Sequence, residues 1–196
     1  MMLSRLLLFL TLPLYILDQA TKAWTVSNFS EPHPGYFGTQ DIPWMIIPDV
    51  FHWTRVHNQG VAFGLGNGTA WAPIVFLLVP IIALVMIRIF WKKGVFEHII
   101  SKIAVALLLC GILGNLTDRL VQGFLLEWVK DGSFWERLSS GYVVDFISVK
   151  LPFYDKIVPS SQGWWPTFNV ADSCICIAAV LLFIGGIKDE QAKKKA

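Results

Sequence analysis

Charged side chains and metal-binding patterns are both scarce in this chain of 196 residues. Only 15% of the residues are charged, whereas about a quarter is typical of a soluble domain. The three cysteines form no CxxC pair and the four histidines form no HExxH, so no disulfide framework, zinc site or other metal or cofactor is expected. Cys110, Cys174 and Cys176 lie in apolar runs and are expected to pack between helices. The net charge of +2 is too small to indicate nucleic-acid binding.

Hydrophobic residues, in contrast, make up 55% of the chain. They form four long runs, at about residues 3–24, 71–91, 99–121 and 168–187. A bilayer crossing needs about 20 apolar residues, so each run predicts a transmembrane helix. The first run is longer than the apolar region of a signal peptide and no A-x-A site follows it, so it is expected to be retained. The sequence therefore predicts an all-α membrane protein, with residues 1–196 as a single integral membrane domain.

Lysine and arginine are distributed unequally between the two sides of these spans. Nine of them fall in short segments on one side: Arg5, Arg88, Lys92, Lys93, Lys102, Lys188, Lys193, Lys194 and Lys195. The two long connections, 25–70 and 122–167, carry Arg55, Lys130, Arg137, Lys150 and Lys156. The positive-inside rule then predicts that both termini are cytoplasmic and both connections extracytoplasmic. Trp24, Trp71, Trp91 and the pair Trp164–Trp165 fall at span ends, as an aromatic belt requires.

The two connections are expected to form a small extracytoplasmic cap, rich in β-structure and amphipathic segments. Val50–Val56 is rich enough in β-branched and aromatic residues to predict a strand on the membrane surface. Gly60, Gly64, Gly66 and Gly68 then interrupt the chain before the second span. Phe124–Leu138 mixes Phe, Leu and Trp with five charges, which indicates short amphipathic helices in the membrane interface. A water-exposed cap is the alternative.

Polar residues occur inside three of the four spans, although an ionisable residue at mid-bilayer costs on the order of 3 kcal/mol. With the predicted orientation, all three clusters meet in the outer leaflet. The clusters are Asp18, Gln19 and Lys22; Asn115, Asp118 and Arg119; and Asn169 with Asp172. A fourth carboxylate, Asp145, lies just outside the spans. This convergence favours a functional site.

Each cluster also has a purely structural interpretation. Asp18 and Lys22 could pair along one helix, and Asn169 could cap the helix that Asp172 begins. Arg119 could extend to the lipid head groups. Gly111 and Gly114 are spaced for close helix packing.

The polar residues fall into five short strings: LDQATK (17–22), NQGVAFG (58–64), GILGNLTDRL (111–120), VVDFI (143–147) and FNVADS (168–173). In this order, on four such spans, they resemble lipoprotein signal peptidase, also called signal peptidase II. The resemblance covers nearly the whole chain. It implies an aspartic endopeptidase that removes signal peptides from diacylglyceryl-modified prolipoproteins, cleaving before the lipidated cysteine. The enzyme is then expected in the bacterial inner membrane, in contact with membrane lipid, as a monomer with its active site at the outer leaflet.

The resemblance also assigns the site residues. Asp145, in VVDFI, and Asp172, in FNVADS, are the expected catalytic pair. The supporting positions near the substrate are Asp18, Lys22, Asn58, Gly60, Asn115, Asp118, Arg119, Asn169 and Ala171. In one respect the chain departs from the family: Asp118 and Asp145 are 27 positions apart because residues 124–140 look inserted.

Three other functions are less well supported by the sequence. A serine protease would need more than Ser101 and Ser173, since no G-x-S-x-G motif is present. A transporter could use Asp18, Asp118 and Asp172 as a relay, but transporter sites lie near mid-membrane, often between internal repeats. The sequence shows no internal repeat and places no carboxylate near mid-membrane. A non-catalytic assembly or lipid-binding protein is separated from the enzyme only by the pair of aspartates.

Overall fold

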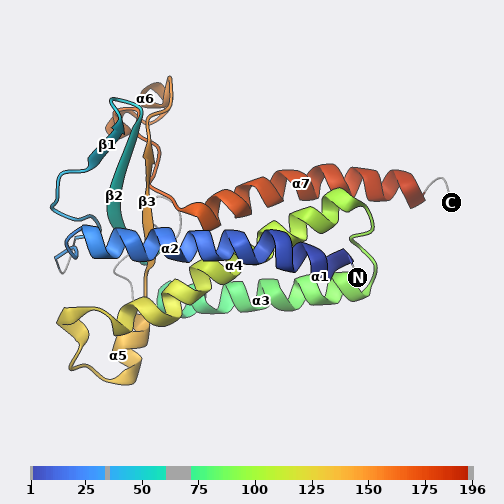
Figure 1. The fold of residues 1–196 in the computed structure, drawn as a ribbon, viewed down its shortest axis with the longest axis horizontal. Helices are drawn as coiled ribbons and strands as arrows, with labels where there is room; N and C mark the ends of the chain where they lie inside the picture. Colours follow the sequence, from blue (N-terminus) through green and yellow to red (C-terminus); the bar gives the residue numbers. More distant parts are fainter. Residues whose placement is uncertain (1, 34–35, 61–71, 194–196) are drawn as a thin grey trace. The chain divides into compact units, whose positions relative to one another are not determined.

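The computed structural model describes residues 2–33, 36–60 and 72–193, which are mostly helical with one small sheet (Figure 1). The chain divides into two compact units. The helical unit comprises Met1–Gln19, Leu77–Thr117 and Val170–Ala196, and the sheet unit comprises Ala20–Phe76 and Asp118–Asn169. The prediction of a mostly helical chain with a small β-rich part is confirmed.

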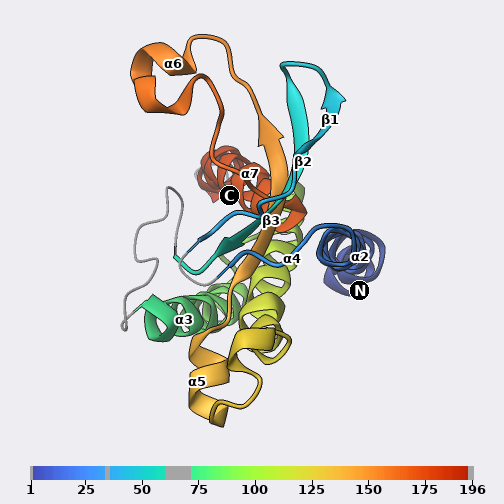
Figure 2. The ribbon, with the colours of Figure 1, turned by 90° about the vertical axis from the view of Figure 1, so that its left-hand side faces the viewer.

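Four helices are long and apolar enough to cross a membrane, as predicted. These candidate spans are Leu3–Asn28, Val75–Lys92, Ile99–Phe124 and Val170–Gln191. Three of them belong to the helices α3 (Ala72–Lys92), α4 (Ile99–Val121) and α7 (Val170–Lys193). In the helical unit these helices and the N-terminal one lie side by side, with α4 between the others (Figure 2). Half of the α4 span is buried, against 6–22% of the other three.

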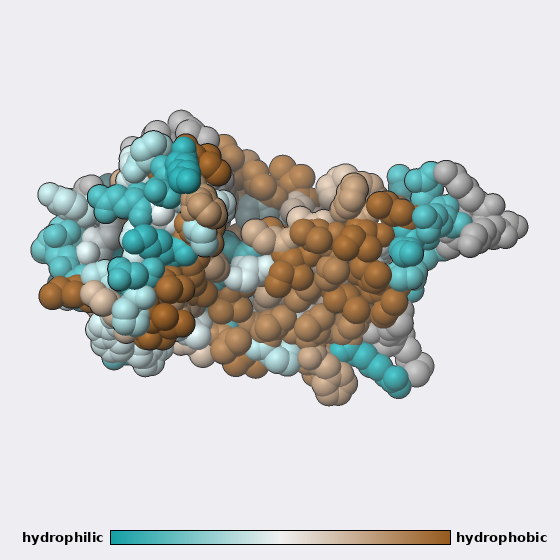
Figure 3. Space-filling view, turned by 90° about the horizontal axis from the view of Figure 1, so that it is seen from above, coloured by the Kyte–Doolittle hydropathy of each residue, from teal (hydrophilic) through white to brown (hydrophobic). Residues whose placement is uncertain are grey.

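The surface of the helical unit is largely apolar, as a lipid-facing surface requires. Figure 3 shows hydrophobic residues covering the helices on the face in view. Large hydrophobic side chains stand exposed on every span, among them Phe9, Ile82, Leu113 and Phe183. In water such a surface would cause aggregation, whereas in a bilayer the lipid tails cover it.

The first span is a continuous helix with a local distortion. It consists of α1 (Met2–Leu6), a π-helical turn η1 (Leu7–Thr11) and α2 (Leu12–Asn28). Pro13 explains the wider turn, because it has no backbone N–H to donate to the preceding turn. The N–H of Leu12 instead reaches the carbonyl of Leu7, a π-type hydrogen bond.

Small residues allow the helices of the helical unit to approach closely. A Cβ atom on Gly111 would lie 2.5 Å from the carbonyl oxygen of Ala171, and one on Gly114 would lie 2.6 Å from a carboxylate oxygen of Asp18. The close packing predicted from these glycines is therefore confirmed. The same unit has a core of Leu107, Cys110, Cys174 and Ala178.

The sheet unit contains one antiparallel sheet with the strand order β1-β2-β3. Its strands are β1 (Trp44–Ile47), β2 (Phe51–Asn58) and β3 (Val143–Val149). The strand predicted at 50–56 is thus confirmed as β2, whereas β1 and β3 were not predicted. In the pairing of β2 with β3, Val56 lies opposite Asp145.

Short helices occupy the rest of the connection between α4 and α7. They are the 3-10 turns η3 (Gln122–Phe124), η4 (Glu127–Val129) and η5 (Pro159–Ser161), with α5 (Phe134–Ser139) and α6 (Tyr154–Ile157). The short helices predicted within 124–138 are therefore present. Their expected location in the membrane interface stays a prediction at this point.

One prediction is wrong, and several fall on residues that the structure does not describe. Cys110 and Cys174 are buried as expected, but Cys176 is exposed, because it lies on a different face of α7 from Cys174. Outside the described residues lie Gly64, Gly66, Gly68, Trp71, Lys194, Lys195 and positions 61–64 of the second motif.

The glycine packing predicts how two alanine substitutions differ. Gly111→Ala should lower the midpoint of thermal unfolding in detergent, because the new methyl group meets the backbone of Ala171 and overpacking costs about 1–3 kcal/mol. Gly186→Ala is the matched control, since nothing lies within 4 Å of its added Cβ. It should be neutral or slightly stabilising. Equal midpoints for the two variants would contradict this account of the packing.

Candidate functional site

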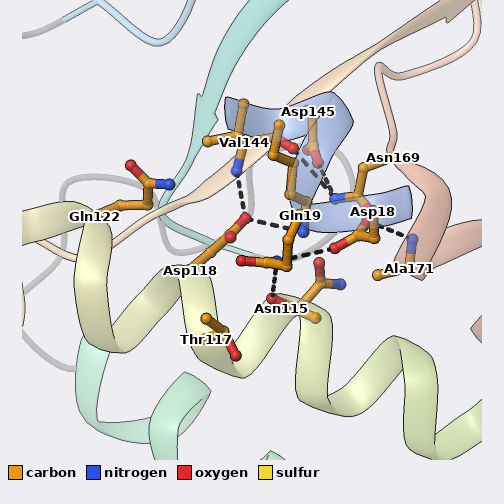
Figure 4. A network of polar contacts seen from close by, with 12 residues as sticks. Asp18, Gln19, Asn115, Thr117, Asp118, Gln122, Val144, Asp145, Asn169 and Ala171 are labelled. Atoms are coloured by element: carbon orange, nitrogen blue, oxygen red, sulfur yellow. Dashed lines mark hydrogen bonds and ion pairs between the residues drawn. The ribbon is translucent and has the colours of Figure 1, made fainter. Parts of the chain in front are cut away.

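Asp145 is held by two asparagine side chains within the sheet unit. Its Oδ1 accepts a hydrogen bond of 2.7 Å from the amide of Asn169 (Figure 4), and its Oδ2 accepts one of 3.0 Å from the amide of Asn58. Asn58 ends β2, next to the strand that carries Asp145, and Asn169 lies immediately before α7. The carboxylate is only 2% exposed. Both of its oxygens are therefore oriented by uncharged donors.

Asp118 forms a buried ion pair in the same unit. The Nζ of Lys22 lies 2.9 Å from its Oδ2, and both side chains are 1% exposed. The same oxygen accepts the backbone N–H of Val144 at 3.1 Å. The residue before Asp145 is thus tied to α4 through a carboxylate whose charge Lys22 balances, as burial of a charge requires.

Arg119 binds the chain that follows β2. Its guanidinium donates to the carbonyls of Gln59, at 3.3 Å, and Gly60, at 2.7 Å. It also lies 4.9 Å from the ring centre of Phe76. The backbone N–H of Gly60 in turn donates to the side chain of Asn58 at 3.1 Å. Arg119 and Asn58 together fix the backbone at Gly60.

In the helical unit, Asp18 caps the N-terminus of α7. Its Oδ1 accepts the backbone N–H of Ala171, the second residue of that helix, at 2.8 Å (Figure 4). The first N–H groups of a helix have no partner within it and favour a negative charge. Gln19 donates both to Asp18, at 3.1 Å, and to the carbonyl of Gly114, at 3.2 Å. Ala171 is fully buried beside Gly111 and Gly114, so a larger side chain would not fit there.

Asp172 also accepts a hydrogen bond from an asparagine. The amide of Asn115, on α4, donates to its Oδ1 at 2.7 Å. Asp172 is the third residue of α7. It is partly exposed, unlike Asp18. A partly exposed carboxylate with a fixed orientation can reach a bound molecule.

The predicted site residues therefore group by unit. The sheet unit brings together Lys22, Asn58, Gly60, Asp118, Arg119, Asp145 and Asn169. The helical unit brings together Asp18, Asn115, Ala171 and Asp172. Within the described part of the chain, no group of three His, Cys, Asp or Glu side chains is suited to a metal ion.

Sequence reasoning missed a second buried network in the sheet unit. Arg55, only 4% exposed, donates to His57 Nε2 at 3.0 Å and to the carbonyl of Phe29, just beyond the end of α2, at 2.8 Å. His57 stacks on Tyr142, with ring centres 3.6 Å apart. Burial lowers the pKa of His57 to about 2, and the nearby Arg55 adds to this shift. Burial also raises the pKa of Tyr142 to about 12. His57 is thus a neutral acceptor, one residue before Asn58.

Comparisons with known proteins agree on one family. Residues 10–188 match the family described as "Signal peptidase (SPase) II". The chain is 31% identical to the lipoprotein signal peptidase of Pseudomonas putida, over 95% of this chain and 89% of that protein. It is 32% identical to the protein of the same name in Geobacter sulfurreducens, over 91% of this chain and 89% of the relative.

A solved structure gives the same result for the fold. It is described as a bacterial membrane enzyme determined by the in meso method, and it superimposes with a TM-score of 0.68. The two sequences are 26% identical, and the alignment covers 97% of this chain and 92% of the other.

The buried ion pair predicts a non-additive pair of substitutions. Lys22→Met and Asp118→Asn should each lower the free energy of unfolding by about 3–5 kcal/mol, because each leaves one buried charge without its partner. The double variant should be less destabilised than the sum of the two single variants. Unfolding of all four proteins in the same detergent measures the coupling. Additive losses would mean that the contact contributes nothing as a pair.

The buried histidine predicts a pH dependence of stability. Because the folded state lowers the pKa of His57 from 6.5 to about 2, the unfolded chain binds more protons between these values. The free energy of unfolding should therefore fall as the pH drops below about 6.5, by up to about 1.4 kcal/mol per pH unit. His57→Gln should flatten this slope between pH 7 and pH 5. An unchanged slope in the variant would show that other groups cause it.

Proposed function

Because this chain belongs to the signal peptidase II family of aspartic proteases, we propose that it cleaves prolipoproteins before the diacylglyceryl-modified cysteine, with Asp145 and Asp172 as the catalytic pair. Membership of the family makes the chain a hydrolase that removes signal peptides from prolipoproteins. Its four apolar helices, together with its bacterial signal peptidase II relatives, make it a multi-pass protein of the inner membrane. The finer assignment of cleavage position and residues is the proposal.

The observation that carries the proposal is the type of partner that each aspartate has. Asp145 accepts from Asn58 and Asn169, and Asp172 accepts from Asn115. An asparagine amide is an uncharged donor, so these contacts orient each carboxylate without adding a positive charge beside it. A fixed orientation is what a carboxylate needs in order to exchange protons with a bound water and a substrate.

The other two acids have structural partners that suit a supporting role. Asp118 is paired with Lys22 and holds the backbone of Val144. Asp18 holds the N-terminal turn of α7 through Ala171. Each of these two carboxylates is thus engaged in holding the backbone around the site. Of the four acids, Asp145 and Asp172 therefore fit catalysis best.

Two carboxylates that share one proton can supply both the base and the acid for peptide hydrolysis. In the proposed mechanism the ionised carboxylate takes a proton from a water molecule, whose oxygen attacks the scissile carbonyl carbon. The protonated partner gives its proton to the carbonyl oxygen. When the tetrahedral intermediate collapses, the C–N bond breaks, the leaving amine takes a proton from one carboxyl group, and a hydroxyl proton of the intermediate returns to the other carboxylate. The asparagine amides keep the carboxylates oriented throughout.

We infer the orientation of the protein in the membrane from the distribution of its charges. The dense lysine and arginine segments favour cytoplasmic termini and an extracytoplasmic sheet unit. A diacylglyceryl group lies in the outer leaflet, so the bond next to it lies at the membrane surface. An active site at that depth would reach the lipid-anchored substrate without extracting it from the bilayer. We expect the protein to act there as a monomer.

The proposal predicts that both aspartates are indispensable. In bilayers containing a diacylglyceryl prolipoprotein, Asp145→Asn and Asp172→Asn should each lower the cleavage rate by at least about a thousandfold, since neither amide can transfer the proton. Mass spectrometry of the product should place the lipidated cysteine at its N-terminus. Cleavage at another bond would disprove the proposed specificity.

Two further variants serve as controls for this experiment. Asp155→Asn alters an exposed acid of α6 in the sheet unit and should leave the rate unchanged. Asp18→Asn should reduce the rate less than the catalytic variants, because an amide oxygen can still accept the N–H of Ala171. Normal turnover by either catalytic variant, with its unfolding midpoint intact, would disprove the assignment of the pair.

A further inference from the structure

The connection from α4 to β3 exposes an unusual number of large apolar side chains. Residues 122–141, here called the 122–141 excursion, contain Leu125, Trp128, Phe134 and Trp135, which are 60, 48, 59 and 73% exposed. They lie along η4, α5 and the turn before η4. In water such a cluster would oppose solubility, so the cluster indicates a contact surface.

The excursion has a defined backbone conformation that keeps these side chains exposed. Leu126 is 1% exposed and packs in a core with Tyr142 and Val144. Arg137 donates to the carbonyl of Phe124 and lies 5.0 Å from the centre of its ring. A glycine lies near each end of the excursion. Gly123 packs against the carbonyl of Arg137, and Gly141 packs against the carbonyl of Arg119. Neither position has room for a Cβ atom. The exposed apolar groups are therefore presented by a fixed backbone.

Most charged groups of the excursion are satisfied within it. Ser133 and Glu136 form a reciprocal capping box at the start of α5. Lys130 and Glu127 are paired at 3.0 Å. With two basic and three acidic side chains, the excursion has no positive excess that would attract nucleic acid or an anionic surface. Any contact it makes must depend on its apolar side chains.

The position of the excursion along the chain identifies the partner. It begins at Gln122, immediately after the membrane-spanning helix α4, whose last residues Leu120 and Val121 are each 45% exposed. Exposed apolar side chains thus lie on both sides of the buried Gln122 and Gly123, at the end of α4 and again from Leu125 onward. Tryptophan, phenylalanine and leucine are the side chains that partition into the head-group region of a bilayer.

We propose that the 122–141 excursion is an interfacial anchor, whose apolar side chains insert into the lipid head-group region at the end of α4. Because Leu126 packs against Tyr142 and Val144, the anchor is joined directly to the strand that carries Asp145. It therefore fixes the depth of this strand relative to the membrane surface. The anchor requires only that α4 spans the bilayer and does not depend on the catalytic assignment.

Spin labels on the full-length protein in vesicles test the anchor without an activity assay. Single cysteines replace Trp128, Phe134 or Trp135 in a background in which Cys110, Cys174 and Cys176 are alanine. Asp131→Cys is the matched control, an exposed charged position of the same excursion. Collision rates with oxygen, which concentrates in lipid, and with a water-soluble nickel chelate then report the depth of each label.

We expect the ratio of oxygen to nickel collisions to be several-fold higher at 128, 134 and 135 than at 131. The ratio should be the same in phosphatidylcholine vesicles with or without phosphatidylglycerol and at high salt, because the contact is apolar. Equal nickel access at all four positions would overturn the proposal in favour of a water-exposed cap. Labels shielded from both reagents would overturn it in favour of a protein partner or a second copy of this chain. Using three apolar positions guards against one variant that fails to fold.

Discussion

The arrangement of the sheet unit depends on one buried ion pair. Lys22, near the end of α2, and Asp118, near the end of α4, are almost completely shielded from solvent. A buried charge without a partner costs several kcal/mol, so neither side chain can leave the other easily. Asp118 also binds the backbone N–H of Val144. One carboxylate therefore fixes two helix ends and the strand that positions Asp145.

The four acids of the motifs differ in the donors that hold them. Asp118 has an ammonium partner, and Asp18 accepts a backbone N–H from the first turn of α7. Asp145 and Asp172 accept from asparagine side chains, which are uncharged donors and orient the carboxylate. The proposed catalytic pair therefore shares one type of donor, although all four acids belong to the same set of motifs.

Sequence alone predicted the four spans because long apolar runs leave few alternatives to a membrane helix. It did not predict β3, because Val143–Phe146 is buried on both faces and so shows none of the alternation that marks a half-buried strand. The structure pairs Lys22 with Asp118, 96 positions further along the chain, a partner that sequence spacing could not suggest. Contacts between distant segments have no local signal, and the network of Arg55, His57 and Tyr142 was missed for the same reason.

The connection between Asp118 and Asp145 shows how such a site can accommodate a long segment between two of its residues. Although 27 positions separate the two aspartates, the carboxylate of Asp118 still reaches the N–H of Val144. Lengthening a loop costs little entropy, about 0.6 kcal/mol for each doubling. The close backbone approaches at Gly123 and Gly141, together with the buried Leu126, close the segment on itself. The segment can therefore carry an exposed apolar surface of its own while the contacts at its two ends are kept.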